Sequence, residues 1–135
     1  MAWENYSDEM RKASKSMNEG NDCTVIAWSN CFDAPYSHSH FWMKKHGRRN
    51  RCGMLSKEIK KAFENCKKAK IRVGPYAKDN RISLSAFCKA HPVGRYYVLV
   101  ARHALCVKDG VVHDWKYGPR RQVQYAVRVY LEGEI

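Results

Sequence analysis

The feature that most restricts the fold of this chain is a series of β-forming segments in its last third, two of which flank an Asp-Gly pair. Valine, tyrosine and other β-formers dominate these segments, and the last one alternates apolar with polar side chains. Asp109-Gly110 is among the strongest short signals for a β-hairpin, which joins antiparallel strands. We therefore expect an antiparallel sheet in this region. Its expected strands cover residues 95–100, 103–107, 111–115 and 122–131.

Helical patterns occupy the earlier part of the chain. Ser7, Asp22 and Ser83 are residue types that begin helices, and the stretches after them carry apolar side chains at helical spacing. The expected helices cover residues 7–17, 23–31, 36–45, 57–68 and 84–90, and a short strand is expected at 71–73. Helices followed by an antiparallel sheet define the α+β class. We expect one domain over residues 1–135, with residues 1–20 as an N-terminal helical extension.

The composition restricts the compartment and the partners. A length of 135 residues suffices for one hydrophobic core. No apolar run approaches the roughly 20 residues that span a bilayer, and the N-terminal residues lack the pattern of a signal peptide. The cysteines contain no CxxC pair, so free thiols in a reducing compartment are expected. We accordingly expect a cytoplasmic protein that does not contact a membrane, and its oligomeric state stays open.

Positive charge is high and concentrated. The net charge is +12, and residues 44–72 are rich in lysine and arginine, with Glu58 and Glu64 as the only acidic side chains. Such a field attracts polyanions, either nucleic acid or an acidic protein surface. The alternative is a solvated face that keeps the protein soluble. The residues expected to form a basic binding face are Lys44, Lys45, Arg48, Arg49, Arg51, Lys60 and Lys61.

Cys23 is the cysteine best placed for nucleophilic chemistry. It follows a polar loop at residues 18–21 and begins the apolar helix expected at residues 23–31. A helix N-terminus carries partial positive charge and unpaired N–H groups, which favour a thiolate over a thiol. The same groups, including the Cys23 N–H, can hold a developing oxyanion.

The hairpin at Asp109-Gly110 also predicts a partner for His103. If these two residues form the whole turn, Leu105 faces Asp114 across the strands, and His103 lies two residues further along the same face. Diagonal neighbours in an antiparallel pair lie about 7–8 Å apart, a gap that long side chains bridge. The Asp114 carboxylate is therefore expected to hold the His103 imidazole. A three-residue loop would shift this register.

These residues together predict a catalytic triad. A nucleophilic thiol needs a base that accepts its proton, and that base needs a third group that fixes its tautomer. Cys23, His103 and Asp114 are the candidates for these roles. The alternative is that Cys23 is a small buried residue and that His103 is a histidine satisfied within the sheet.

Histidines and cysteines around the third expected helix allow another interpretation, a zinc-stabilised nucleic-acid module. Its ligands would be Cys31, His38, His46 and Cys52. No two histidines of this segment stand four residues apart, the spacing that stacks two ligands on one helix face. His38 and His40 fall on different faces. We therefore expect no metal and no other cofactor.

A large part of the sequence resembles a known family. The segments NDCTVIAW, GRRNRCGM and, above all, GRYYVLVARHALCVKDGVVHDW are similar to small cysteine-peptidase-like proteins of tailed bacteriophages, within the papain-like superfamily. The resemblance extends over residues 21–130. It implies a compact papain-like fold in which Cys23 is the nucleophile, His103 the general base and Asp114 the orienting acid.

The resemblance also implies a side chain that completes the oxyanion hole, for which Asn21 or Asp22 is the candidate. The superfamily typically uses a glutamine further upstream, in the neighbourhood where this chain has Glu19. The implied function is a thiol hydrolase that cleaves an amide or isopeptide bond in a protein or peptide, in the host-cell cytoplasm if the protein is viral. The alternative is a catalytically inactive papain-like scaffold whose basic face binds and inhibits an acidic protein or nucleic acid.

Overall fold

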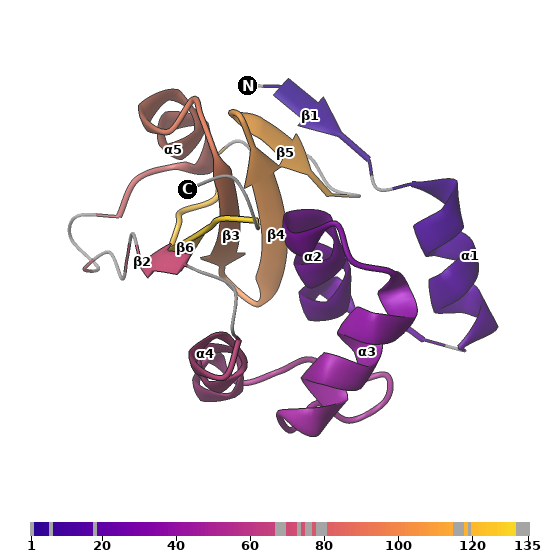
Figure 1. Cartoon of the computed structure of the whole chain (residues 1–135). Coiled ribbons are helices and arrows are strands. Elements are labelled where there is room, and N and C mark those ends of the chain that lie inside the picture. The colour runs from indigo at the N-terminus through magenta and orange to yellow at the C-terminus, as the bar shows by residue number, and fades with distance from the viewer. Residues whose placement is uncertain are drawn as a thin grey trace.

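The computed structural model of the chain describes residues 2–5, 7–17, 19–66, 70–72, 74, 77, 81–114, 118 and 120–131. Within them, helices dominate the first part and strands the last part, so the predicted α+β class is confirmed (Figure 1). The helices are α1 (Asp8–Ser16), α2 (Cys23–Phe32), α3 (Tyr36–Lys45), α4 (Ser56–Glu64) and α5 (Leu84–Ala90). The strands are β1 (Ala2–Glu4), β2 (Lys70–Arg72), β3 (Arg95–Val100), β4 (His103–Lys108), β5 (Val111–His113) and β6 (Tyr125–Val129).

The strands of the described residues form one sheet in the order β1-β5-β4-β3-β6-β2. Its centre is the antiparallel series β5-β4-β3-β6, which is formed by the four strands that the sequence predicts in this region. The edge strand β1 pairs in parallel with β5, and Trp3 lies opposite Val112. The sheet is therefore mixed, and the prediction of a wholly antiparallel sheet is wrong at this edge. Because β1 belongs to the sheet, residues 1–20 are not a purely helical extension.

The turn between β4 and β5 is the two-residue hairpin that the sequence predicts. Lys108 lies opposite Val111, so Asp109 and Gly110 are its central residues. Their φ values of 48° and 78° both lie in the left-handed region, as a type I′ turn requires. Gly110 adopts this conformation at little cost because it has no Cβ. The turn thereby sets the register of the two strands.

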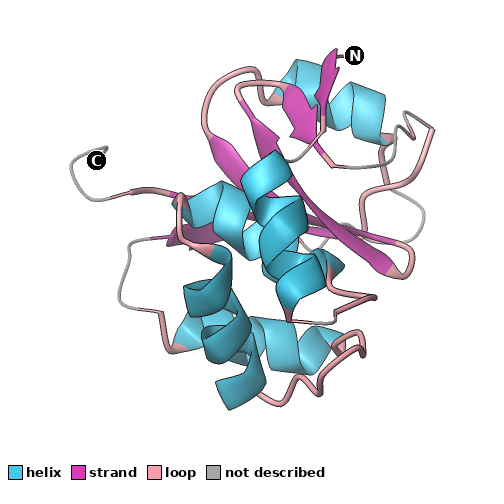
Figure 2. Ribbon diagram, turned by 90° about the vertical axis from the view of Figure 1, so that its right-hand side faces the viewer, coloured by secondary structure: helices cyan, strands magenta, loops and turns pink. Residues whose placement is uncertain are grey.

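Helices cover both faces of the sheet (Figures 1 and 2). α2 and α4 pack on the face that receives Tyr97 and Leu99 of β3, and α3 packs against these helices. α5 packs on the opposite face, where Tyr96 and Val98 of the same strand are buried. Successive side chains of a strand point to opposite faces, so β3 contributes to two separate hydrophobic clusters.

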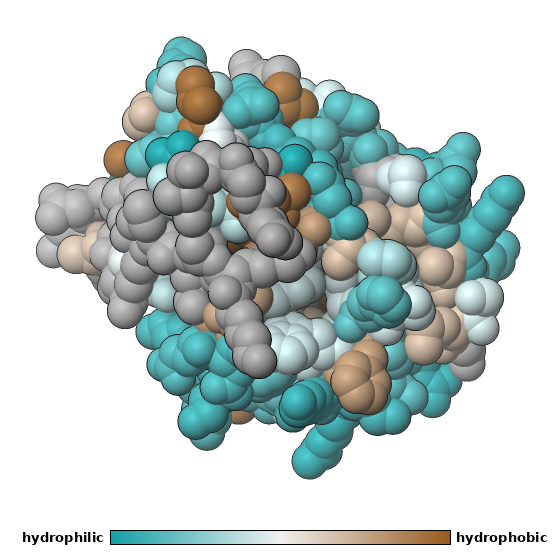
Figure 3. Space-filling view, viewed as in Figure 1, coloured by the Kyte–Doolittle hydropathy of each residue, from teal (hydrophilic) through white to brown (hydrophobic). Residues whose placement is uncertain are grey.

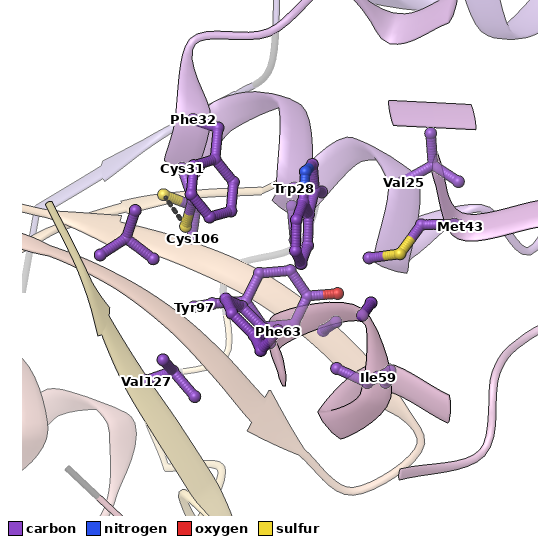
Figure 4. Close-up of a cluster of buried hydrophobic side chains, with 14 of the residues drawn as sticks. Val25, Trp28, Cys31, Phe32, Met43, Ile59, Phe63, Tyr97, Cys106 and Val127 are labelled. Carbon is purple, nitrogen blue, oxygen red and sulfur yellow. Dashed lines mark hydrogen bonds between the residues drawn. The ribbon is translucent and has the colours of Figure 1, made fainter. Parts of the chain in front are cut away.

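Aromatic rings form the centre of the core between α2, α4 and the sheet (Figure 4). The ring centroids of Trp28 and Phe32 lie 4.5 Å apart, and those of Trp28 and Phe63 lie 4.6 Å apart. Phe63 also meets Tyr97 edge to face, at 5.1 Å. Buried aromatic side chains remove large apolar areas from water, so this cluster is a main source of stability. It fastens α2, the helix that begins at Cys23, to the sheet.

The far end of α2 approaches β4 through two buried thiols (Figure 4). Cys31 Sγ lies 3.0 Å from Cys106 Sγ, and the Cys31 thiol donates to the Tyr96 carbonyl oxygen at 3.3 Å. Burial, followed by the neighbouring Cys106 thiol, raises the pKa of Cys31 well above its ordinary value. The Cys31 thiol therefore stays protonated at neutral pH. The six cysteines are free thiols, as the sequence predicts.

Helix boundaries agree with the prediction where a serine begins the helix. The Ser7 hydroxyl accepts from the Met10 N–H at 3.2 Å, and the Ser83 hydroxyl accepts from the Ala86 N–H at 3.1 Å. α5 has the predicted bounds, and so does α3, although α3 begins after Pro35 without a side-chain cap. A serine hydroxyl satisfies an N–H group that the first helical turn leaves without a partner, which explains why these starts can be predicted.

Other boundaries differ by a few residues. α2 ends at Phe32, one residue beyond the predicted end, whereas α4 ends at Glu64 rather than at residue 68. Residues 67–69 lie outside the described residues, as do Val73 and Trp115 at the predicted ends of two strands. β6 is shorter than the predicted strand at 122–131. None of the helices in the described ranges combines the length and the apolar character that crossing a bilayer requires.

Candidate active site

Cys23 is the first residue of α2, and its side chain is half-buried. The Asp22 carbonyl oxygen accepts from the N–H groups of Val25 and Ile26, both at 3.0 Å, so the helix begins where the sequence predicts. The Tyr97 hydroxyl donates to the Thr24 carbonyl oxygen at 3.1 Å and ties this first turn to the sheet. The thiol is thereby held at the positive end of the helix.

The predicted contact between His103 and Asp114 is confirmed. His103 Nε2 lies 2.7 Å from Asp114 Oδ2, and the two side chains are only 8% and 2% exposed. His103 begins β4, and Asp114 directly follows β5. The Asp114 N–H donates to the Glu4 carbonyl oxygen at 3.0 Å, so the unpredicted strand β1 helps to hold the carboxylate in place.

The surroundings of His103 favour its protonated form. Burial lowers the pKa of the imidazole, but hydrogen bonds with Asp114 and Cys23 and the charges of both groups outweigh burial and raise the pKa to about 9. His103 is therefore an imidazolium at neutral pH. Because Nε2 faces Asp114, Nδ1 is the ring nitrogen left for the Cys23 thiol. An imidazolium beside a cysteine stabilises the thiolate.

Cys23 and His103 line one cavity of about 350 Å³. It lies between the first turn of α2, the loop that precedes α4, and the end of the sheet where β3 turns into β4. Its volume is within the range of sites that bind small ligands or single side chains. Apolar walls come from Met54, Leu55, Ile59 and Leu99, and polar groups come from Thr24, Arg102 and Gln124.

A buried ion pair holds the loop that precedes Cys23. Both carboxylate oxygens of Glu19 accept from the Arg48 guanidinium at 2.9 Å, and the Arg51 N–H donates to the same carboxylate at 2.7 Å. His40 Nε2 contacts it as well. Burial raises the pKa of Glu19, but these hydrogen bonds and the charge of Arg48 outweigh burial and lower the pKa to about 2. The ionised carboxylate is an acceptor only, so Glu19 cannot donate to an oxyanion.

The two side chains implied for the oxyanion hole have other partners. Asp22 Oδ2 accepts from the Ser14 hydroxyl at 2.6 Å and from the Tyr36 hydroxyl at 2.7 Å. Asp22 occupies the N-cap position of α2, as the sequence predicts, but its side chain makes no capping hydrogen bond there. Asn21 has a left-handed φ of 55°, and its Nδ2 donates to the Arg51 carbonyl oxygen at 3.3 Å. Both residues position the loop in front of α2.

Most of the predicted basic face is exposed. Its residues lie on α3, on the loop after it and on α4, whose outer edge is strongly hydrophilic (Figures 1 and 3). Arg48 is the exception, because its pairing with Glu19 leaves it only 2% exposed, and its assignment to this face is wrong. Lys60 is half-buried, with Nζ 5.2 Å from the centroid of the Tyr125 ring. The exposed members are Lys44, Lys45, Arg49, Arg51 and Lys61.

The ligands of the alternative zinc module do not come together. Cys31 is buried against Cys106 in the core, whereas Cys52 is exposed on the loop after α3. His46 Nδ1 bonds to the Trp42 carbonyl oxygen at 2.8 Å. In the part of the chain that the structure describes, no three His, Cys, Asp or Glu side chains form a group that could hold a metal ion.

Two parts of the site have no clear signal in the sequence. The side-chain and backbone partners of Glu19 lie 21 to 32 residues away, beyond the range of any local pattern. Thr24 lies in an apolar helix, where the sequence predicts only an ordinary buried residue. The one available hint is that Glu19 is an acid shortly before the predicted nucleophile in a strongly basic chain.

Comparisons of the chain with family models, curated proteins and solved structures found no match. The site is therefore defined by its own geometry, in which Cys23 and His103 share a cavity and Asp114 lies behind the imidazole.

Proposed function

We propose that this protein is a thiol hydrolase that cleaves an amide or isopeptide bond with Cys23, His103 and Asp114, on a papain-like scaffold. One observation carries the proposal: a half-buried thiol at a helix start and a histidine bonded to a buried carboxylate line the same cavity. The three side chains come from α2, from β4 and from the end of β5, so only the folded chain assembles them.

Each residue has a separate role in the proposed reaction. In the resting pair His103 already holds the proton of the Cys23 thiol, and the thiolate attacks the carbonyl carbon of the substrate. The tetrahedral intermediate collapses when the His103 imidazolium protonates the leaving amine, which leaves a thioester on Cys23. Water, deprotonated by His103, then hydrolyses the thioester. Asp114 fixes the tautomer and orientation of the ring throughout.

The charge state of His103 suits this chemistry. A pKa of about 9 keeps the ring protonated at neutral pH, so an acid is ready beside the leaving group. A protein or peptide substrate fits the cavity, whose apolar walls can receive one side chain beside the scissile bond.

We further propose a cytoplasmic location, because a nucleophilic thiol and five further free cysteines are best preserved in a reducing compartment.

Competitive alkylation tests the proposal within one molecule. The protein is treated with limiting iodoacetamide at about pH 7, and the label on each cysteine is mapped by mass spectrometry. Cys52 is the internal reference because it is exposed and lies outside the cavity. We expect Cys23 to react at least about tenfold faster than Cys52, since an imidazolium beside a thiol favours the reactive thiolate. Equal labelling of the two residues would refute the proposal.

The exposed basic face supports a second candidate function, a binding module for a polyanion. The exposed lysines and arginines lie on neighbouring elements, α3, the loop after it and α4. A field of this kind binds nucleic acid or an acidic protein with strong salt dependence. In that case the papain-like scaffold would bind an acidic partner and the triad would be inactive.

Titration with a fluorescent DNA duplex tests the second function. Substituting Lys44 and Lys61 by glutamine should weaken binding and reduce its dependence on salt, because binding with fewer phosphate contacts releases fewer counterions. The matched control replaces Lys12 and Lys15 of α1, which are also exposed but lie outside the basic face. Equal losses in the two variants would mean that net charge alone, and not this face, governs the binding.

A further inference from the structure

Hydrolysis of an amide requires donors for the oxyanion, and the side chains in front of α2 do not supply one. Glu19 and Asp22 offer carboxylate oxygens that already accept hydrogen bonds, and Asn21, whose amide donates to a carbonyl of the loop after α3, does not line the cavity. The helix itself supplies the N–H groups of its first two residues, which precede the first N–H that donates to the Asp22 carbonyl oxygen. These include the Cys23 N–H.

Thr24 provides the missing type of group. It is only 3% exposed, and its hydroxyl oxygen Oγ1 has no hydrogen-bond partner among the described residues. It also lines the cavity that contains Cys23 and His103. A buried hydroxyl without a partner is destabilising, and a valine of nearly the same shape would avoid that loss. The unused hydroxyl therefore points to a ligand in the cavity.

The position of Thr24 suits a donor to the acyl oxygen. Side chains of an α-helix lean toward its N-terminus, so the hydroxyl of the second residue lies near the N–H groups of the first turn. The Tyr97 hydroxyl holds the Thr24 carbonyl oxygen at 3.1 Å, which fixes this residue on the sheet before any substrate binds. A donor that is already in place stabilises developing charge without reorganisation.

We propose that the Thr24 hydroxyl and the Cys23 N–H form the oxyanion hole. This inference rests on the proposed thiol hydrolase. When Cys23 Sγ bonds to the carbonyl carbon, the π electrons of the C=O bond move to the oxygen, and Thr24 donates a hydrogen bond to that oxyanion. The carbon–oxygen double bond then reforms as the leaving group departs with its electron pair, and a thioester remains on Cys23.

Two reagents separate the role of Thr24 from the reactivity of the thiol. Iodoacetamide alkylates a thiolate by displacing iodide and forms no oxyanion. Acylation by p-nitrophenyl acetate passes through an oxyanion and releases p-nitrophenolate, so it needs both the thiolate and the hole. The rates of both reactions at Cys23 are measured in the full chain carrying Cys52→Ser, which removes the exposed competing thiol.

Thr24→Val removes the hydroxyl and keeps the shape, whereas Thr24→Ser keeps the hydroxyl. We expect Thr24→Val to slow acylation at least about tenfold, on the scale of a lost oxyanion donor, while the alkylation rate stays within about twofold. Thr24→Ser should retain most of the acylation rate. Loss of acylation that is equal in both variants, or no loss in Thr24→Val, would overturn the role of Thr24.

Failure of the proposed function gives a different result. If Cys23 lacks an activated thiolate, iodoacetamide reacts slowly with the unsubstituted Thr24 protein as well. Rapid alkylation without any detectable acetylation of Cys23 would mean that no oxyanion hole exists, which overturns the inference but leaves the activated thiol intact.

Discussion

Replacing Glu19 by glutamine should destabilise the protein strongly, although the two side chains have nearly the same size. The Glu19 side chain is fully buried and accepts two hydrogen bonds from Arg48 and one from the Arg51 N–H. Glutamine removes the negative charge and leaves the Arg48 guanidinium buried without its counterion. Removing one partner of a buried ion pair typically costs about 3–5 kcal/mol.

The pKa of Glu19 gives an independent magnitude. Its folded value of about 2 lies below the ordinary 4.5, and each pKa unit corresponds to about 1.4 kcal/mol, so ionisation contributes about 3 kcal/mol to folding. A carboxyl group whose pKa is lowered by folding contributes this stability above its unfolded pKa. The contribution is lost as pH falls from about 4.5 through about 2. Glu19→Gln should therefore lower the free energy of unfolding by about 3 kcal/mol at neutral pH.

Urea unfolding at a series of pH values measures both effects. We expect the wild type to lose stability between about pH 4.5 and pH 2, and the loss in Glu19→Gln to be smaller by the Glu19 contribution. The melting temperature at neutral pH should fall by about 10 °C or more.

Asp8→Asn is the matched control for Glu19→Gln. It removes an acid that pairs with Arg11 at 3.7 Å on the exposed surface of α1, so it should cost less than about 1 kcal/mol. A similar small cost for Glu19→Gln, with an unchanged dependence on pH, would refute the buried ion pair.

Three further substitutions test other parts of the structure. Asp114→Asn should lower the pKa of His103 from about 9 toward its ordinary 6.5, which an NMR titration of the imidazole would detect; an unchanged pKa would mean that Asp114 is not the dominant partner. Phe63→Ala should lower the free energy of unfolding, measured with urea, by about 3–5 kcal/mol, because it leaves a cavity in the aromatic core beside α2. Tyr36→Phe should cost about 1.5–3 kcal/mol by removing the hydroxyl that donates to the Asp22 carboxylate; a neutral effect would count against that bond.

The parts of the fold that could be predicted depend on local chemistry. Asp109-Gly110 determines a turn type, the turn determines the register, and the register brings His103 to Asp114. The Ser7 hydroxyl satisfies one N–H group in the first turn of the helix that follows it, so that boundary can also be predicted from the sequence. In each case the interacting groups are close in sequence or are linked by one short turn.

The parts that could not be predicted depend on distant partners. Strand β1 is too short for an alternating pattern, and only its parallel pairing with β5 makes it a strand. Arg48 resembles its exposed neighbours in sequence, but Glu19, 29 residues away, buries it. Aspartate is a residue type that often caps a helix with its side chain, but the Asp22 carboxylate accepts hydrogen bonds from two hydroxyl groups of α1 and α3 instead. Tertiary contacts outweigh the local preference in these cases.

The most direct test of the central claim is the rate of Cys23 alkylation as a function of pH, in the wild type and in His103→Ala. The account predicts fast labelling of the wild type at about pH 6, well below the ordinary pKa of a free thiol, and loss of that fast phase in the variant. With negatively charged iodoacetate, the wild-type rate should also fall as pH rises through about 9, where His103 loses its proton. A rate that rises only near the ordinary thiol pKa of about 8.5, and equally in both proteins, would contradict it.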